Sequence, residues 1–122
     1  MRDTVDAGAD LLVVQTNNAT FGFTDESVQQ AAMSRLRAVE HGRAVAHVST
    51  VGVSAMIAPD GRVLERAGLF TQAVLEATLP LRTSTTLADR VGAWGEAALA
   101  ALGLLGALAI ALVGRRGLGR PR

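Results

Sequence analysis

The sequence contains no cysteine, and because all twelve of its basic positions other than histidine are arginine, it contains no lysine either. Without cysteine, this chain can form no disulfide bond, thiolate nucleophile or cysteine-ligated metal site. Histidine is also scarce: His41 and His47 lie six residues apart with no cluster of carboxylates around them, so their spacing does not favour a metal site. We therefore expect no metal and no other cofactor.

Aromatic residues make up 3% of the chain although 49% of it is hydrophobic, so alanine, valine and leucine supply most of its apolar surface. The net charge is only +1, since 12 arginines nearly balance 11 acidic residues. A nearly neutral chain gives no electrostatic reason to expect a nucleic-acid partner. Its 122 residues are enough for one small domain.

The first half of the chain shows helix and strand patterns in turn. Residues 2–9 fit the end of a helix, residues 11–15 form a short apolar run typical of a buried strand, and residues 16–22 fit a loop. A helix is predicted over 25–42, with Gly42 as the residue that ends it. Its apolar positions at helical spacing predict one stripe facing the core: Val28, Ala31, Ala32, Leu36 and Val39.

The next residues predict an antiparallel region. Two strands are expected, roughly over 44–50 and 52–58, followed by a turn and a return strand that begins at Val63. Alternating side chains predict a further strand near 72–78. Residues 80–88 form a polar, threonine-rich linker. The pattern therefore indicates an α/β fold.

The last part of the chain is apolar. No residue from Ala97 to Gly114 is charged, Trp94 precedes this run, and an arginine-rich tail follows it over 115–122. These features predict a transmembrane helix over 94–114, with the tail in the cytoplasm and residues 1–93 on the extracytoplasmic side of the cell membrane. A buried helix of a soluble protein is the alternative, but the other residues are too few to cover one and also form their own core.

The chain opens on polar residues, without the apolar segment of a signal peptide. Export of residues 1–93 then needs another explanation. We expect that further membrane helices precede this sequence and that it is a fragment of a longer protein.

Four stretches in order resemble a single family. Residues 8–22 are similar to a strand and loop of the form T/S-N-D/N-x-W-F-G, and residues 33–43 to a helix of the form A-R-x-R-A-x-E-x-x-R-P. Residues 49–62 resemble the hairpin N/T-x-G-I-S/T-A-x-I-x-P-x-G, and residues 86–94 the approach T-P-Y-x-R-x-G-x-W. These are patterns of the apolipoprotein N-acyltransferases, which belong to the nitrilase (carbon–nitrogen hydrolase) superfamily.

The resemblance implies the C-terminal part of a nitrilase-type αββα sandwich followed by one transmembrane helix. Residues 1–80 would be a partial hydrolase domain, and residues 81–93 a linker. The sequence departs from the family pattern at Thr20, where tryptophan is frequent, and at Ala44 and Leu87, where proline is usual.

The same resemblance implies a chemistry that this chain cannot perform alone. In the family, a Glu–Lys–Cys triad takes an acyl chain from a phospholipid as a cysteine thioester and passes it to the N-terminal diacylglyceryl-cysteine of a lipoprotein. All three catalytic residues are expected upstream of Met1. Within this chain we therefore expect no catalytic residue, and we expect the chain alone to be inactive.

A few residues remain candidates for a supporting role. Asn17 and Asn18 either line the pocket or only cap a turn, and Phe21 either walls the acyl pocket or packs in the core. Arg37 and Glu40 share a helix face and are expected to form a structural ion pair. Arg35 and Arg43 either meet phospholipid head groups or are solvated at the surface. A serine nucleophile is not expected, because no His–Asp pair accompanies Ser49, Thr50 or Ser54 in the sequence.

Three other interpretations remain open. One is a soluble amidase or nitrilase, which the apolar run over 97–114 argues against. Another is a non-catalytic membrane-anchored interaction module, for example one that anchors a polyprenol-phosphate mannose synthase. The third is a product that does not fold, since half a sandwich exposes strand edges and apolar faces.

Overall fold

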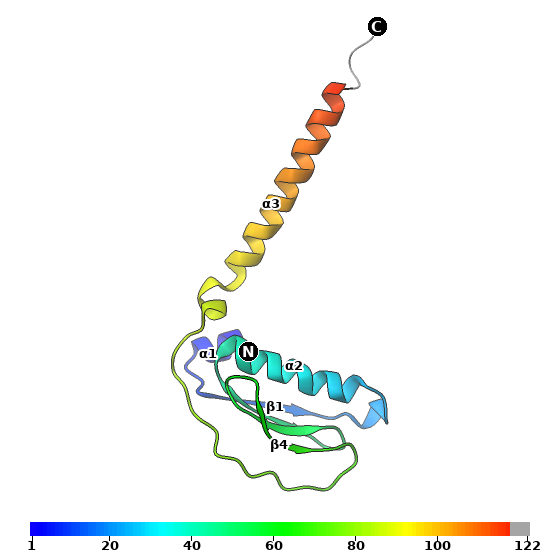
Figure 1. The fold of residues 1–122 in the computed structure, drawn as a ribbon, viewed down its shortest axis with the longest axis vertical. Helices are drawn as coiled ribbons and strands as arrows, with labels where there is room; N and C mark the ends of the chain where they lie inside the picture. Colours follow the sequence, from blue (N-terminus) through cyan, green and yellow to red (C-terminus); the bar gives the residue numbers. More distant parts are fainter. Residues whose placement is uncertain (118–122) are drawn as a thin grey trace. The chain divides into compact units, whose positions relative to one another are not determined.

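The computed structural model describes the backbone of residues 1–117, together with all side chains in this range except those of 93, 96 and 112–117. The chain divides into two compact units, Met1–Asp89 and Arg90–Arg122. The first unit contains a four-stranded sheet and the helices that cover one of its faces (Figure 1). The described residues of the second unit form the larger part of the last helix.

The sheet is mixed, with strand order β1-β2-β3-β4. Strands β1 and β2 are parallel and connected through helix α2, whereas β2–β3 and β3–β4 pair antiparallel. The ladder between β3 and β4 is irregular next to Met56 and Ile57. The elements of this unit are α1 (Arg2–Asp6), β1 (Leu11–Thr16), the 3₁₀ turn η1 (Ala19–Phe21), α2 (Glu26–His41), β2 (Ala44–Ser49), β3 (Ser54–Ile57) and β4 (Val63–Ala67). The predicted α/β class is confirmed.

Helix α2 ends where the sequence predicts. Gly42 has φ 60° and ψ 30°, a left-handed conformation that glycine adopts without strain. Its N–H group bonds the carbonyl of Val39, and the N–H of Arg43 bonds the carbonyl of Ala38. These bonds satisfy the last helical carbonyls and turn the chain directly into β2.

The predicted core face of α2 is correct at Ala31, which is buried, and wrong at its other four positions. The side chains that pack on the sheet are mostly small or polar, whereas Val28, Leu36 and Val39 are 41%, 63% and 52% exposed. The residues buried on this helix are Ser27, Ala31, Ser34, Ala38 and His41. Small side chains let the helix approach the sheet closely, and hydrogen bonds satisfy the polar ones, so hydrophobicity alone did not identify most of the buried positions.

The core lies between the sheet and its two helices. It is formed by Val5 of α1, Ala38 of α2 and apolar side chains of three strands: Leu12, Val45, Ala55 and Ile57. The opposite sheet face is less covered, since Val13 and Val48 are 66% and 43% exposed. Successive strand residues point to opposite faces, which places these two valines away from α2.

The strand predicted near 72–78 is absent. Residues 71–86 form neither helix nor strand, and Val74 is 86% exposed. The alternating pattern there has no neighbouring strand to supply backbone hydrogen bonds. Helix α3 then begins earlier than predicted and spans Leu87–Gly117, with a non-helical Gly92 near its start.

Within the described residues, no helix combines the length and the apolar character needed to cross a membrane. The predicted transmembrane helix over 94–114 is therefore not supported. The predicted tail over 115–122 lies outside the described side chains.

Candidate functional site

Two loops meet at the carboxyl ends of the parallel strands β1 and β2. The register pairs Thr16 with Ser49, so the residues that follow each strand lie side by side. The N–H of Thr50 continues the ladder by bonding the carbonyl of Thr16 at 3.3 Å. Carboxyl ends of parallel strands are where α/β folds usually place ligand-contacting loops, and these two loops are therefore the candidate site.

Asn17 joins the two loops. Its Oδ1 accepts a hydrogen bond from the hydroxyl of Thr50 at 3.0 Å and another from the N–H of Ala19 at 3.2 Å. The second bond is the turn-capping role considered for this residue. The bond from Thr50 also fixes the position of the β2–β3 loop. Because it joins residues 33 positions apart, turn propensity does not predict it.

Asn18 is 2% exposed and lies under the same loops. Its Nδ2 donates to the hydroxyl of Ser27 at 2.9 Å, and the N–H of Val53 donates to that same hydroxyl at 2.9 Å. Its Oδ1 has no hydrogen-bond partner. A Cβ atom on Gly52 would lie 2.3 Å from Ser27 Oγ and 2.4 Å from Asn18 Nδ2, so only glycine fits at this approach.

A cavity of about 300 Å³ lies beside these loops on the sheet face away from α2. Three hydroxyl groups, those of Ser49, Thr50 and Ser54, line one part of it. The rest is lined by the polar residues Thr71 and Gln72 and by apolar side chains, among them Val48, Met56 and Leu75. The cavity thus combines an apolar wall with hydroxyl groups near the strand ends.

The hydroxyl groups are held by local bonds. Ser49 Oγ accepts from the N–H of Gly52 at 2.9 Å, and Ser54 Oγ accepts from the N–H of Ser49 at 3.0 Å. Thr50 bonds Asn17, as described above. None of these bonds involves a histidine, which is a frequent activating base for a hydroxyl nucleophile.

Phe21 is half-buried and does not line this cavity. The aromatic contact in the region is formed instead by Phe23 and Phe70, whose ring centroids are 4.5 Å apart. That contact depends on the path of the chain after β4, which no local pattern indicates.

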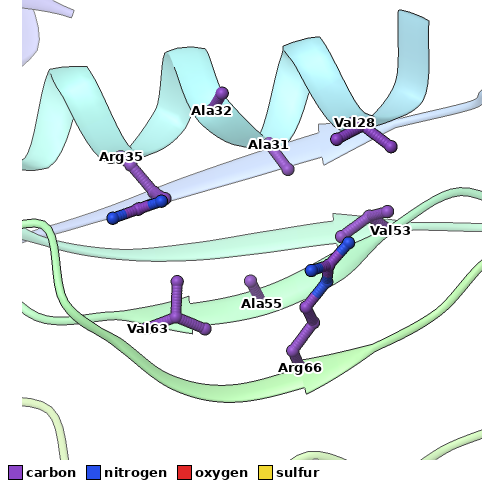
Figure 2. A pocket seen from close by; sticks show the side chains of 8 residues that line it. All are labelled: Val28, Ala31, Ala32, Arg35, Val53, Ala55, Val63 and Arg66. Carbon is purple, nitrogen blue, oxygen red and sulfur yellow. The ribbon is translucent and has the colours of Figure 1, made fainter. Parts of the chain in front are cut away.

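The arginines of α2 have different environments. Arg35 donates from Nε to the carbonyl of Gly61 at 2.9 Å, and Arg37 forms an ion pair with Glu40. Figure 2 shows Arg35 beside a small pocket of about 100 Å³ between α2, β3 and β4, into which Arg66 also reaches. This pocket is a packing gap at the edge of the core, and its walls are mainly alanine and valine.

Arg43 is buried, with 2% of its surface exposed, so neither surface role considered for it is correct. Its Nε donates to the carbonyl of Ala9 at 2.8 Å, and its Nη1 donates to the carbonyls of Ser84 at 2.7 Å and His41 at 3.3 Å. The guanidinium group thereby connects three chain segments. It is a structural residue.

A second polar cluster lies near Arg43, at the C-terminal end of α2. Nδ1 of His41 lies 2.6 Å from Oδ1 of Asp89, and both side chains are 2% exposed. The hydroxyl of Thr86 lies 3.0 Å from Asp89 Oδ2 and bonds the carbonyl of Glu40. Burial alone would raise the pKa of Asp89, but the hydrogen bonds from His41 and Thr86 outweigh it and lower this pKa below its usual value.

Among the described residues, no three histidine or carboxylate side chains come together as metal ligands. His41 and His47 bond different partners, Asp89 and Ser34. The cluster around His41 escaped the sequence analysis because its members are separated by 48 residues and a linker without regular structure.

The family model and the similar curated proteins point to the same family. The family described as carbon-nitrogen hydrolase matches residues 1–89. Similar curated proteins are the apolipoprotein N-acyltransferases of Mycolicibacterium smegmatis, 44% identical over 107 residues, Shewanella oneidensis, 34% over 92 residues, and Gloeobacter violaceus, 39% over 117 residues. These alignments cover 86%, 75% and 95% of this chain but only 17%, 18% and 22% of the relatives.

Proposed function

Because the chain belongs to the carbon–nitrogen hydrolase family, we propose that it acts as the C-terminal part of an apolipoprotein N-acyltransferase. In this proposal the nucleophile and its partners are supplied by sequence outside this chain, which has neither cysteine nor lysine. The acyl group comes from a phospholipid and is transferred to the N-terminal diacylglyceryl-cysteine of a lipoprotein. The chain alone performs no transfer.

One observation carries the proposal. The loops after β1 and β2 are fixed to one another by Asn17 and Thr50, and they border a cavity with an apolar wall and a hydroxyl rim. An acyl chain needs such an apolar wall, whereas the polar groups of an ester or amide need hydrogen-bonding groups near it. The contribution of this chain is therefore to position and accommodate the acyl group beside a nucleophile that another segment carries.

The proposal is tested by a chimera. The matched 107 residues of the Mycolicibacterium smegmatis relative are replaced by the corresponding part of this chain, and acyl transfer from phospholipid to a diacylglyceryl-peptide is followed by mass spectrometry. We expect transfer by the chimera and none by this chain alone. A folded chimera without activity, or transfer by the isolated chain, would contradict the proposal.

A pair of variants in the chimera tests the cavity itself. Val48→Trp places a large side chain in the cavity, and we expect it to lower acyl transfer at least about tenfold because the acyl chain loses its space. Val74→Trp is the control: Val74 is 86% exposed and does not line the cavity. Equal activity of the two variants would show that the cavity does not hold the acyl group.

A non-catalytic interaction module is the second candidate. Helix α3 exposes a row of large apolar side chains, with Leu99, Leu104 and Ile110 each more than 70% exposed. Such side chains are costly in water and favour contact with another surface. A chimera that folds without activity would favour this candidate over the acyltransferase.

A further inference from the structure

The outer face of helix α2 carries an apolar stripe, made of four of the five residues that the sequence predicted to face the core. Val28, Leu36 and Val39 are 41%, 63% and 52% exposed. Ala32 lies between them and is also exposed, and Figure 2 shows it pointing away from the sheet. The four residues are spaced by four, four and three positions, which places them along one side of the helix. A continuous apolar stripe, unlike a single exposed leucine, is typical of a face that packs against another surface.

The stripe forms one side of an open groove of about 600 Å³ between α2 and the turn that connects β3 to β4. A hydrogen bond and close packing hold this turn against the helix. Nε of Arg35 donates to the carbonyl of Gly61 at 2.9 Å, and a Cβ atom on Gly61 would lie only 2.8 Å from Cγ2 of Val39. The groove is therefore a fixed part of the first unit. Its lining joins the stripe residues Ala32, Leu36 and Val39 to Asp60 and Arg62 of the turn.

The two ends of this face carry opposite charges. Asp25 lies exposed at the N-terminal end, immediately before the first residue of α2. Arg62 borders the groove at the other end, together with Val39, and its side chain is 72% exposed. Nε of Arg62 is 3.8 Å from a carboxylate oxygen of Asp60, and an exposed pair of this kind contributes little, so Arg62 remains available to a second carboxylate. The face is thus acidic at one end and basic at the other.

We propose that this face binds the same face of a second copy of the chain, with the two α2 helices antiparallel. The spacing of the stripe is symmetric about one residue. Val28 and Leu36 each lie four residues from Ala32, and Asp25 and Val39 each lie seven residues from it. A two-fold axis at Ala32 therefore places Val28 against Leu36 of the second copy and brings the acidic end of each helix to the basic end of the other. The small side chain of Ala32 lets the helices approach closely where they cross.

A second copy fits this face better than a partner of a single charge sign. A basic surface would lie against Arg35 and Arg62, and an acidic surface would lie against Asp25, so either would bring like charges together at one end. The antiparallel arrangement pairs opposite charges at both ends. The stripe is short compared with the interfaces of about 800 Å² per partner that are typical of stable complexes, so we expect a weak dimer whose population depends on concentration.

The first experiment is disulfide crosslinking of the full chain, in a mild detergent that covers the apolar side chains of α3. The chain contains no cysteine, so one introduced cysteine is the only thiol. A residue on the two-fold axis meets its own copy, and we expect Ala32→Cys to form a linked dimer at least about tenfold faster than the control Met33→Cys. Met33 is 58% exposed on the same helix but points about 100° away from Ala32. Equal rates, or no linked dimer from Ala32→Cys, would overturn the proposal.

An exchange of charges tests the antiparallel arrangement. Asp25→Arg and Arg62→Asp each bring like charges together, and we expect each to weaken the dimer about threefold or more in sedimentation velocity at low salt. The double variant pairs opposite charges again with their positions exchanged, so its dimer should be as tight as that of the unchanged chain. If the losses of the two single variants simply add in the double variant, the antiparallel dimer is wrong.

A matched pair of variants tests the apolar stripe. Leu36→Glu places a carboxylate in the interface, and we expect it to weaken the dimer at least about tenfold. Val13→Glu is the control, because Val13 is 66% exposed, close to the 63% of Leu36, but lies on the sheet face away from α2. Equal effects of the two variants would assign the association to another surface and overturn the proposal. The groove shares no lining residue with the cavity of the candidate site, so the result does not depend on the acyltransferase proposal.

Discussion

The two ends of helix α2 are both fixed by buried polar side chains, but the chemistry differs. At the N-terminal end, neutral groups of Asn18 and Ser27 surround Gly52 at the carboxyl ends of the parallel strands. At the C-terminal end, charged Arg43 and the His41–Asp89 pair connect α2 to the segment that follows the sheet. The first network depends on close approach of small groups, whereas the second depends on charge-assisted hydrogen bonds.

The two ends of α2 are therefore expected to affect different properties: the loop geometry at the candidate site and the stability of the fold. The neutral end holds the loops that border the candidate cavity, and the charged end holds chain segments that are distant from it in sequence. Disturbing the charged end should lower stability strongly and should respond to pH. Disturbing the neutral end should change the loop geometry at the site and should not depend on pH.

The largest effect is expected for Arg43→Ala. The change removes a buried side chain and leaves the partly buried carbonyls of Ala9 and Ser84 without their donor, and we expect the free energy of unfolding to fall by about 3 kcal/mol. Urea denaturation of the full chain, followed by circular dichroism, measures it. Arg43→Lys keeps the charge but cannot reach both carbonyls with a planar fork, so it should recover only part of the loss. A loss below about 1 kcal/mol for Arg43→Ala would contradict the charged network.

These two networks also show which features of the structure the sequence could predict. Strand and helix periodicity, together with Gly42, predicted α2 and most of the sheet because those signals are local. The buried face of α2 was missed because its serines and histidine are polar, and their burial depends on partners as distant as Asn18, His47 and Asp89. The strand predicted over 72–78 failed for the same reason, since alternation does not show whether a neighbouring strand exists.

The candidate site was predicted only in part. Asn17 and Asn18 were identified as candidates, with two possible roles: lining the pocket or capping a turn. Deciding between these roles requires the position of the β2–β3 loop, which the sequence does not give. The structure shows that Asn17 caps its turn and also bonds Thr50, while Asn18 lies buried against Ser27. For Phe21 the sequence left two roles open, a wall of the acyl pocket or packing in the core, and the structure places it outside the lining of the cavity.

The next largest effect is expected for Gly52→Ala at the neutral end. The added Cβ would lie within 2.6 Å of Ser27, Asn18 and Ser49, and we expect a destabilisation of about 2 kcal/mol from this overpacking. The loss should be the same at pH 5 and pH 7, because none of the three neighbours titrates in that range. A loss that changes with pH would show that the two networks are coupled.

A smaller, pH-dependent effect is expected for Asp89→Asn. Its pKa in the folded chain is lower than in the unfolded chain, so the ionised carboxylate adds stability above the unfolded value of about 4, and this stability is lost as the pH falls through the folded pKa. At pH 7 we expect a loss of about 1 to 2 kcal/mol from the weakened bonds to His41 and Thr86.

The measurement is urea denaturation at pH 7, 5 and 3. The difference between the variant and the unchanged chain should shrink from pH 7 to pH 3, because Asp89 then approaches its protonated form. His47 should produce a further decline in both proteins below pH 6.5: its lowered pKa means that the unfolded chain binds a proton first. A constant difference across the three pH values would contradict the assignment of the charge to Asp89.

The smallest effect is expected for Gly103→Ala, which repeats the chemistry of Gly52→Ala where no neighbour opposes it. No atom lies within 4 Å of a Cβ added at Gly103, and the residue is in the interior of α3. Alanine has the higher helix propensity, so this change should stabilise α3 by about 0.5 to 1 kcal/mol and increase its helical circular dichroism signal. Adding one methyl group is therefore expected to destabilise the chain at Gly52 and to stabilise it at Gly103. If Gly103→Ala also destabilises the chain, α3 is packed against another surface at this position, which would support the interaction module.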